Sequence, residues 1–257
     1  MRGGGEIGLA LTLLATGAWG QAAAAPKVDS PLSTAQVVQG MVAMNAARTE
    51  ALNAYTARRS YHVVYDGMGH KSATMQVRVS FQQPGPKVLT EVFETGSGIL
   101  RNHVLDPLLK QERRQADIAG HYGSSITPKN YRFTQLDFPR PGGPKDYVLK
   151  VEPHDSDSPD RFLFRGTIWV NPADFGIERI EGQLLRSPSW WVTHTHFNLH
   201  NQRISDFYFP SSNHITSHVR FLGHAVLDIS YDNFELTSIR AVSPFAGDGM
   251  RSLEPLQ

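Results

Sequence analysis

The segment from Arg161 to Leu185 alternates apolar and polar residues, which is the pattern of β-strands rather than of helices. Large apolar side chains share one face of its first half: Phe162, Phe164, Ile168 and Val170. Pro172 and Gly176 then mark a turn, and a second extended run begins at Ile177. The segment therefore predicts a β-hairpin whose apolar face must be covered by a core, a helix or an apolar ligand.

The same alternation recurs along most of the chain. Further strands are predicted at residues 61–65, 75–82, 88–93, 131–136, 147–151, 189–200, 216–221 and 225–236. Short turns that contain Gly or Pro join the first three, which is typical of an antiparallel meander. The sequence therefore predicts a mainly β fold of the α+β class, built on an antiparallel sheet.

Two stretches have helical spacing instead. Apolar residues recur every three or four positions between Ser33 and Tyr55, and Ser33 or Thr34 can cap the start. A second apolar stripe runs from Gly96 to Ala116 and contains Pro107, which should kink the helix or split it in two. This second helix can cover one end of the sheet or lie at its periphery, and the sequence leaves both open.

The N-terminus has the features of a secretory signal. Arg2 precedes an uncharged apolar run from Ile7 to Trp19, and small residues follow from Ala22 to Ala25. The run is shorter than the roughly 20 residues that span a bilayer; an uncleaved anchor is the alternative. We predict a cleaved signal peptide at 1–25, one domain at 26–243, a disordered tail at 244–257, and a periplasmic location.

Composition narrows the classes of function. The chain has 25 Lys and Arg against 24 Asp and Glu, a net charge of +1 that argues against a nucleic-acid partner. It has no Cys, which excludes both thiol catalysis and a lipid-modified N-terminal cysteine. The sequence also lacks a GxSxG motif, a phosphate-binding loop and a dinucleotide fingerprint. We therefore predict a non-enzymatic protein without a cofactor.

His194 and His196 carry the enzymatic alternative, a metal-dependent hydrolase. Residues two apart on a strand point the same way, so both imidazoles could bind one metal ion. A catalytic zinc needs three protein ligands and one open position. The third ligand would come from His200, His214, His218 or His224. The alternative is that both histidines lie on a solvent-facing surface, and Asn198 in the same phase favours that interpretation.

The order of elements resembles the periplasmic lipoprotein-carrier superfamily, which includes LolA- and LolB-like carriers, outer-membrane lipoprotein-sorting proteins and the RseB sensor domain. GTIWVNPADFGIERIEGQ at Gly166–Gln183 is similar to a hairpin of that group, and FYFP at Phe207–Pro210 is similar to the aromatic–Pro start of a late strand. The resemblance implies a curved antiparallel sheet or half-open β-barrel wrapped around amphipathic helices. It also implies a hydrophobic cavity for lipid or lipoprotein acyl chains.

The strand faces supply candidates for the wall of such a cavity: Val77, Val79, Phe81, Phe162, Phe164, Ile168 and Trp169. Phe164 and Ile168 point opposite to Trp169, so these three cannot all line one wall, and the phase of Phe162 to Val170 is preferred. LolA-type carriers have an Arg before the Pro that ends an early strand, where it helps hold a helical lid closed. This chain has Gln83 there, and Arg59 is the candidate substitute.

We therefore predict an exported protein that binds acyl chains and serves outer-membrane lipoprotein sorting. The alternative is an interaction domain that senses envelope stress, as the likeness to the RseB domain allows, with a membrane protein of the envelope as its partner. The sequence does not distinguish the two.

Overall fold

The computed structural model describes residues 31–67, 69–117, 126–154, 163–186, 192–220 and 223–242, which belong to one compact unit of the chain. The predictions made for the signal peptide, for Phe162 and for the tail lie outside the described residues. No helix among the described residues is long and apolar enough to cross a membrane. The elements are α1 (Thr34–Ala51), β1 (Leu52–Gly67), β2 (Gly69–Gln82), β3 (Val88–Gly96), α2 (Gly98–Leu100), η1 (Arg101–Leu105), α3 (Asp106–Asp117), β4 (Tyr131–Asp137), β5 (Tyr147–Pro153), β6 (Phe164–Val170), β7 (Ile177–Leu184), β8 (Val192–Ile204), β9 (Phe207–Val219) and β10 (His224–Ile239).

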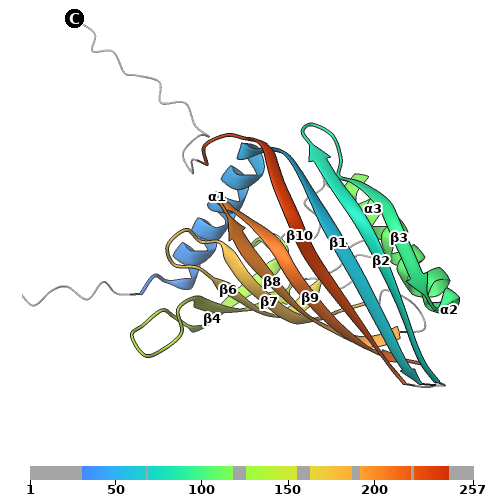
Figure 1. Cartoon of the computed structure of the whole chain (residues 1–257). Helices are drawn as coiled ribbons and strands as arrows, with labels where there is room; N and C mark the ends of the chain where they lie inside the picture. Colours follow the sequence, from blue (N-terminus) through green and yellow to red (C-terminus); the bar gives the residue numbers. More distant parts are fainter. Residues whose placement is uncertain are drawn as a thin grey trace, which may run out of the picture. The chain divides into compact units, whose positions relative to one another are not determined.

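The ten strands form one antiparallel sheet in the order β3-β2-β1-β10-β9-β8-β7-β6-β5-β4 (Figure 1). The first and last strands, β1 and β10, stand third and fourth in this order and pair along most of their lengths. The outermost strands, β3 and β4, each pair on one side only, so the sheet curves without closing. The predicted mainly β fold with a curved, half-open sheet is confirmed.

The two helical segments cover different halves of the same sheet face. One apolar cluster joins η1 and α3 to β1, β2, β9 and β10, and a second joins α1 to β4, β5, β6 and β7. Phe197 of β8 and Ile215 of β9 are direct cross-strand partners, yet each packs in a different cluster. Because such partners point to the same side, both helical segments lie against one face.

Helix α1 begins as the sequence predicts and ends earlier. Ser33 is its N-cap, and the side chains of Ser33 and Gln36 form a capping box. The helix ends at Ala51, because Leu52 is already extended and its partner in the sheet is Ile239 of β10. The helical spacing that continues toward Tyr55 is therefore overridden by strand pairing.

The second helical stretch is split, as Pro107 predicts. A π-helical turn, η1, follows α2, and α3 begins at Asp106, so that Pro107 occupies its first turn. Proline is tolerated there because the N–H groups of a first turn have no partner within the helix. Leu105 and Leu109 are buried against the sheet, so this helical segment covers the sheet instead of lying at its periphery.

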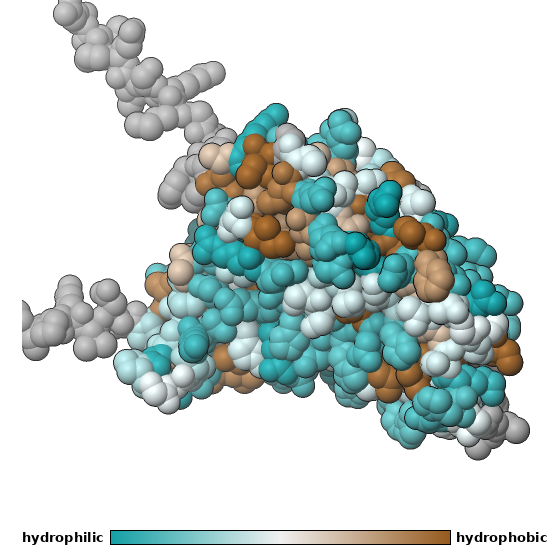
Figure 2. Space-filling model, in the orientation of Figure 1, coloured by the Kyte–Doolittle hydropathy of each residue, from teal (hydrophilic) through white to brown (hydrophobic). Residues whose placement is uncertain are grey.

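The opposite face of the sheet is polar. Outward positions of neighbouring strands carry His62 on β1, Asp228 on β10 and His214 on β9, which are successive cross-strand partners. The space-filling view shows that the strands on the face turned to the viewer are covered largely by hydrophilic residues (Figure 2). The sheet therefore has one apolar face under the helices and one face exposed to water.

Candidate functional site

A cavity of about 380 Å³ lies between the η1–α3 segment and the inner face of the sheet. Five strands and the helical segment line it: Val63, Leu184, Val192, Thr195, Ile215, Ser217, Ala225 and Leu227 from the strands, and His103, Val104, Pro107, Leu108 and Gln111 from the helical side. Val63 and Val192 are buried, whereas His103 and Pro107 are exposed and mark the side that faces solvent. The size falls within the roughly 300–1,000 Å³ of small-molecule sites.

Small side chains leave this space open. Ser217 and Ala225 are cross-strand partners on the inner face, at positions where larger residues would meet the helix. The cavity is open to solvent on the side of His103 and Pro107, so water or a ligand fills it.

A hydroxyl pair forms the only hydrogen bond between side chains of the cavity's described lining. Thr195 Oγ1 and Ser217 Oγ lie 3.0 Å apart, and both residues are buried. Thr195 points inward because a β-bulge in β8 sets both His194 and Thr195 opposite one residue of β9. The backbone accommodates the extra residue of the bulge at His194, which has a positive φ of 49°.

A half-buried ionic cluster holds α3 against the sheet beside the cavity. The Arg59 guanidinium of β1 forms an ion pair with the Glu112 carboxylate of α3, which also accepts a hydrogen bond of 2.9 Å from the Tyr61 hydroxyl. The Arg59 guanidinium carbon lies 5.1 Å from the centre of the Tyr231 ring. Arg59 was predicted as a residue that holds a helix closed, and it does contact the helix over the cavity.

The electrostatics of this cluster favour its charged pair and neutral phenols. Burial lowers the pKa of Arg59, but the charge of Glu112 and the two phenols more than offset that effect, so the pKa is raised. Burial, and then the Glu112 charge, raise the pKa of Tyr61. Burial raises the pKa of Tyr231 to about 12.

The raised pKa values of these phenols predict that the protein loses stability at alkaline pH. An unfolded tyrosine ionises near pH 10, whereas folded Tyr231 keeps its proton up to about 12, so the folded state binds more protons between these values. The free energy of unfolding should therefore fall as pH rises, by roughly 1 kcal/mol per pH unit above pH 10 for this one group. Urea unfolding at several pH values measures the slope. Tyr231→Phe should reduce it, and an unchanged slope in that variant would contradict the assignment.

The residues predicted as cavity wall fall into two groups on the inner face. Val77 and Val79 are buried in the cluster that η1 and α3 cover, and Phe81 packs against that cluster. Phe164 and Ile168 are buried in the other cluster, under α1. None of these five residues lines the cavity described above. They lie in the apolar layer around it, and their contact with a ligand stays a prediction.

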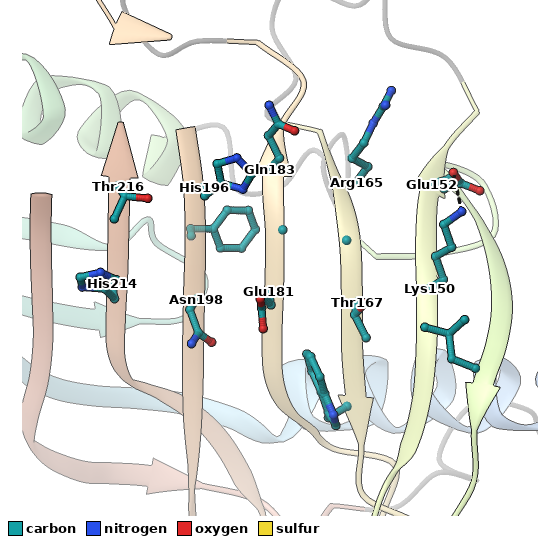
Figure 3. A pocket seen from close by; sticks show the side chains of 15 residues that line it. Lys150, Glu152, Arg165, Thr167, Glu181, Gln183, His196, Asn198, His214 and Thr216 are labelled. Carbon is teal, nitrogen blue, oxygen red and sulfur yellow. Dashed lines mark ion pairs between the residues drawn. The ribbon is translucent and has the colours of Figure 1, made fainter. Parts of the chain in front are cut away.

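Trp169 lies on the opposite face, as its phase in the strand predicts. The guanidinium carbon of Arg179 sits 4.5 Å from its ring centre, and Arg179 also donates to Asn198 Oδ1 at 2.9 Å. Trp169 lines a polar surface groove of about 710 Å³ that crosses β4 to β9 (Figure 3). Lys150 and Glu152 form an ion pair of 3.0 Å at its margin.

Two glycines account for the close approach of strands beneath this groove. Gly166 and Gly182 are direct partners in β6 and β7. A Cβ on Gly166 would come within 2.0 Å of the Glu181 carbonyl oxygen, and one on Gly182 within 2.8 Å of the Phe164 ring. The glycines therefore serve the packing of the two strands, with Phe164 covering Gly182 and contacting Phe197 edge to face.

The metal hypothesis for His194 and His196 is not supported by the geometry. The bulge at His194 interrupts the alternation that would place both rings side by side. The His194 ring instead lies 5.6 Å from that of His218, while the cross-strand partner of His196 is Thr216. Within the part of the chain that the structure describes, no group of three or more His, Asp or Glu could hold a metal ion.

An apolar groove between α1 and β4 is a weaker candidate for the site. It measures about 830 Å³ and is lined by one helix face, including Val38 and Val42, and by Tyr131 and Phe133 of the edge strand. The cavity under α3 is bounded by five strands and a helical segment, so a bound molecule would lose more of its contact with water there.

Sequence reasoning missed the residues that line this cavity from β9 and β10. The apolar stripe of the second helix indicated Val104 and Leu108 as inward-facing. By contrast, Ser217 and Ala225 are small residues on strand faces, and nothing local distinguishes a small residue beside a cavity from one in a tight core.

No protein-family model matches the sequence, and no curated protein matches it. Among solved structures, the chain is similar to a LolA superfamily protein of Nitrosomonas europaea, with 11% identity, a TM-score of 0.40 and coverage of 81% of this chain and 96% of that one. It is similar to a DUF1329 family protein of Desulfovibrio piger, with 12% identity, a TM-score of 0.39 and coverage of 79% and 92%. It is also similar to a putative outer membrane lipoprotein-sorting protein domain of Vibrio parahaemolyticus, with 10% identity, a TM-score of 0.35 and coverage of 78% and 93%. Two of these three structures carry the names of groups that the sequence resembles, the LolA superfamily and the lipoprotein-sorting proteins.

Proposed function

We propose that this chain binds the acyl chain of a lipid or lipoprotein in the cavity between α3 and the sheet. The observation that carries the proposal is the cavity itself, about 380 Å³ with a mainly aliphatic lining. Each methylene of a ligand that leaves water there gains roughly 0.8 kcal/mol. An apolar chain is therefore the ligand class that gains most from this lining.

The arrangement suits reversible binding without chemistry on the ligand. The sheet supplies a fixed wall, and α3 closes the space while it is held by the Arg59–Glu112 pair. His103, Pro107 and Gln111 form the helical rim, where a polar head group could stay in water while its chain enters. Acting in the periplasm, such a protein would carry or sense acylated molecules of the envelope, and we propose lipoprotein sorting as the process.

Filling the cavity provides the test. Ala225→Phe places a large ring into the space, so the affinity for a fluorescent fatty-acid probe should fall at least tenfold. Val226→Phe is the matched control, because this neighbour makes a similar change on the opposite face of the same strand, and its affinity should stay within about twofold of the parent. Equal probe affinity in Ala225→Phe and the parent chain would refute the proposal.

A further inference from the structure

We propose that Thr195 and Ser217 make the cavity selective for chains that carry a carbonyl group, so that the ligand is an acyl group rather than a plain hydrocarbon. This inference rests on the proposed function and names the feature of the ligand that the cavity recognises. Its basis is a hydroxyl pair buried among aliphatic side chains, Val192, Ile215 and Leu227 among them.

A count of hydrogen-bond donors leads to this selectivity. The two hydroxyl groups carry two protons, and the bond of 3.0 Å between their oxygens uses one of them. Among the described residues, no other side chain or backbone acceptor bonds to either hydroxyl. Within the described part of the chain, one O–H donor is therefore left for an acceptor in the cavity, where a donor without an acceptor is unfavourable.

The ligand is the available source of the missing acceptor. A carbonyl oxygen accepts a hydrogen bond, so it can pair with the unused O–H donor of the two hydroxyls. An alkane would leave that donor unpaired after displacing the water that bonds to it. The cavity therefore discriminates against a plain chain by an unsatisfied hydroxyl, as sites built around buried polar groups do.

The backbone supports the interpretation of the pair as a built feature. If side chains alternated regularly after Val192, His194 rather than Thr195 would point to the inner face. The bulge shifts the alternation by one residue, so that Thr195 points inward instead. The shift places His194, a residue other than glycine, at a φ of 49°, a conformation that is sparsely populated for such residues. The chain therefore uses an irregular strand to bring a second hydroxyl next to Ser217.

The test compares three ligands with the same chain length, laurate, methyl laurate and dodecane, as competitors of a fluorescent fatty-acid probe. Thr195→Val and Ser217→Ala each remove one hydroxyl with little change of shape. Either single variant should bind the ester with nearly the parent affinity, since the remaining hydroxyl can donate to the ligand. The double variant should bind methyl laurate roughly 3- to 10-fold more weakly, as expected for one lost hydrogen bond, while dodecane is unaffected or binds more tightly.

Thr193→Val, on the same strand but outside the cavity lining, is the control and should leave all three affinities unchanged. Similar losses for laurate and methyl laurate would identify the carbonyl as the acceptor. A loss for laurate alone would show that the site recognises a free carboxylate instead, and would overturn the inference. An unchanged ester affinity in the double variant, or equal losses for ester and dodecane, would overturn the inference. Failure of every ligand to displace the probe from the parent chain would instead refute the proposed function.

Discussion

Replacing Arg48 with alanine should lower the free energy of unfolding by about 3 kcal/mol, the scale for breaking a buried charged network. The Arg48 side chain is 8% exposed at the end of α1. Its guanidinium donates to the Asp206 carbonyl at 2.7 Å and to the Asp174 carbonyl at 2.9 Å, and it lies 3.2 Å from the Asp174 carboxylate. Burial lowers its pKa, and the Asp174 charge opposes that effect. The substitution would free the end of α1 from two turns of the sheet.

An exposed pair supplies the comparison for Arg48. Arg58 and Asp232 lie 3.5 Å apart with both side chains 49% exposed, so Arg58→Ala should cost less than about 1 kcal/mol. Urea unfolding measures both variants under the same conditions. If Arg48→Ala were no more destabilising than Arg58→Ala, Arg48 would not be an anchor of α1.

Replacing Glu112 with glutamine should cost about 2–4 kcal/mol, because it leaves the Arg59 charge largely buried without its counter-ion. The two side chains are 18% and 20% exposed, and Glu112 also accepts from the Tyr61 hydroxyl. The loss should loosen α3, the element that closes the cavity, and should therefore weaken probe binding as well as stability.

Two further variants test whether the Arg59–Glu112 pair contributes more to stability than a surface ion pair does. Glu152→Gln breaks the Lys150–Glu152 pair, whose side chains are each 48% exposed, and should change stability by less than about 1 kcal/mol. Replacing both Arg59 and Glu112 with methionine and leucine should recover much of the stability that Glu112→Gln loses. A double variant that is less stable than Glu112→Gln would show that the pair itself, and not the unpaired charge, dominates.

Most of the strands were predictable because alternation is a local signal. The exceptions have physical reasons. Helical spacing ran on to Tyr55, but Tyr55 packs against Phe81 and Phe209 from other strands, and that contact decides the local structure. The late strand begins at Phe207, ahead of the predicted position, and contains Pro210. Pro210 is tolerated because β9 pairs with β10 only from Ser212 to His218, so its missing N–H interrupts no bond there.

The cavity could not be located from the sequence in the same way. Its lining combines η1 and α3 with β1 and β7 to β10, and these meet only through the pairing of β1 with β10. Local patterns specify which face a residue occupies and leave open which distant residue stands opposite. Arg59 was identified through a family resemblance, whereas no local pattern singled out its partner Glu112 on α3.

The measurement that tests the central claim most directly is photo-cross-linking with a fatty acid that carries a diazirine near the end of its chain, followed by mass spectrometry of the labelled peptides. We predict labels on η1–α3, β9 and β10, at residues such as Leu108, Ile215 and Leu227, which excess methyl laurate removes and Ala225→Phe prevents. Labels on the α1–β4 groove at Val38, Val42 or Phe133, with none on the cavity residues, would contradict the claim that the space under α3 holds the acyl chain.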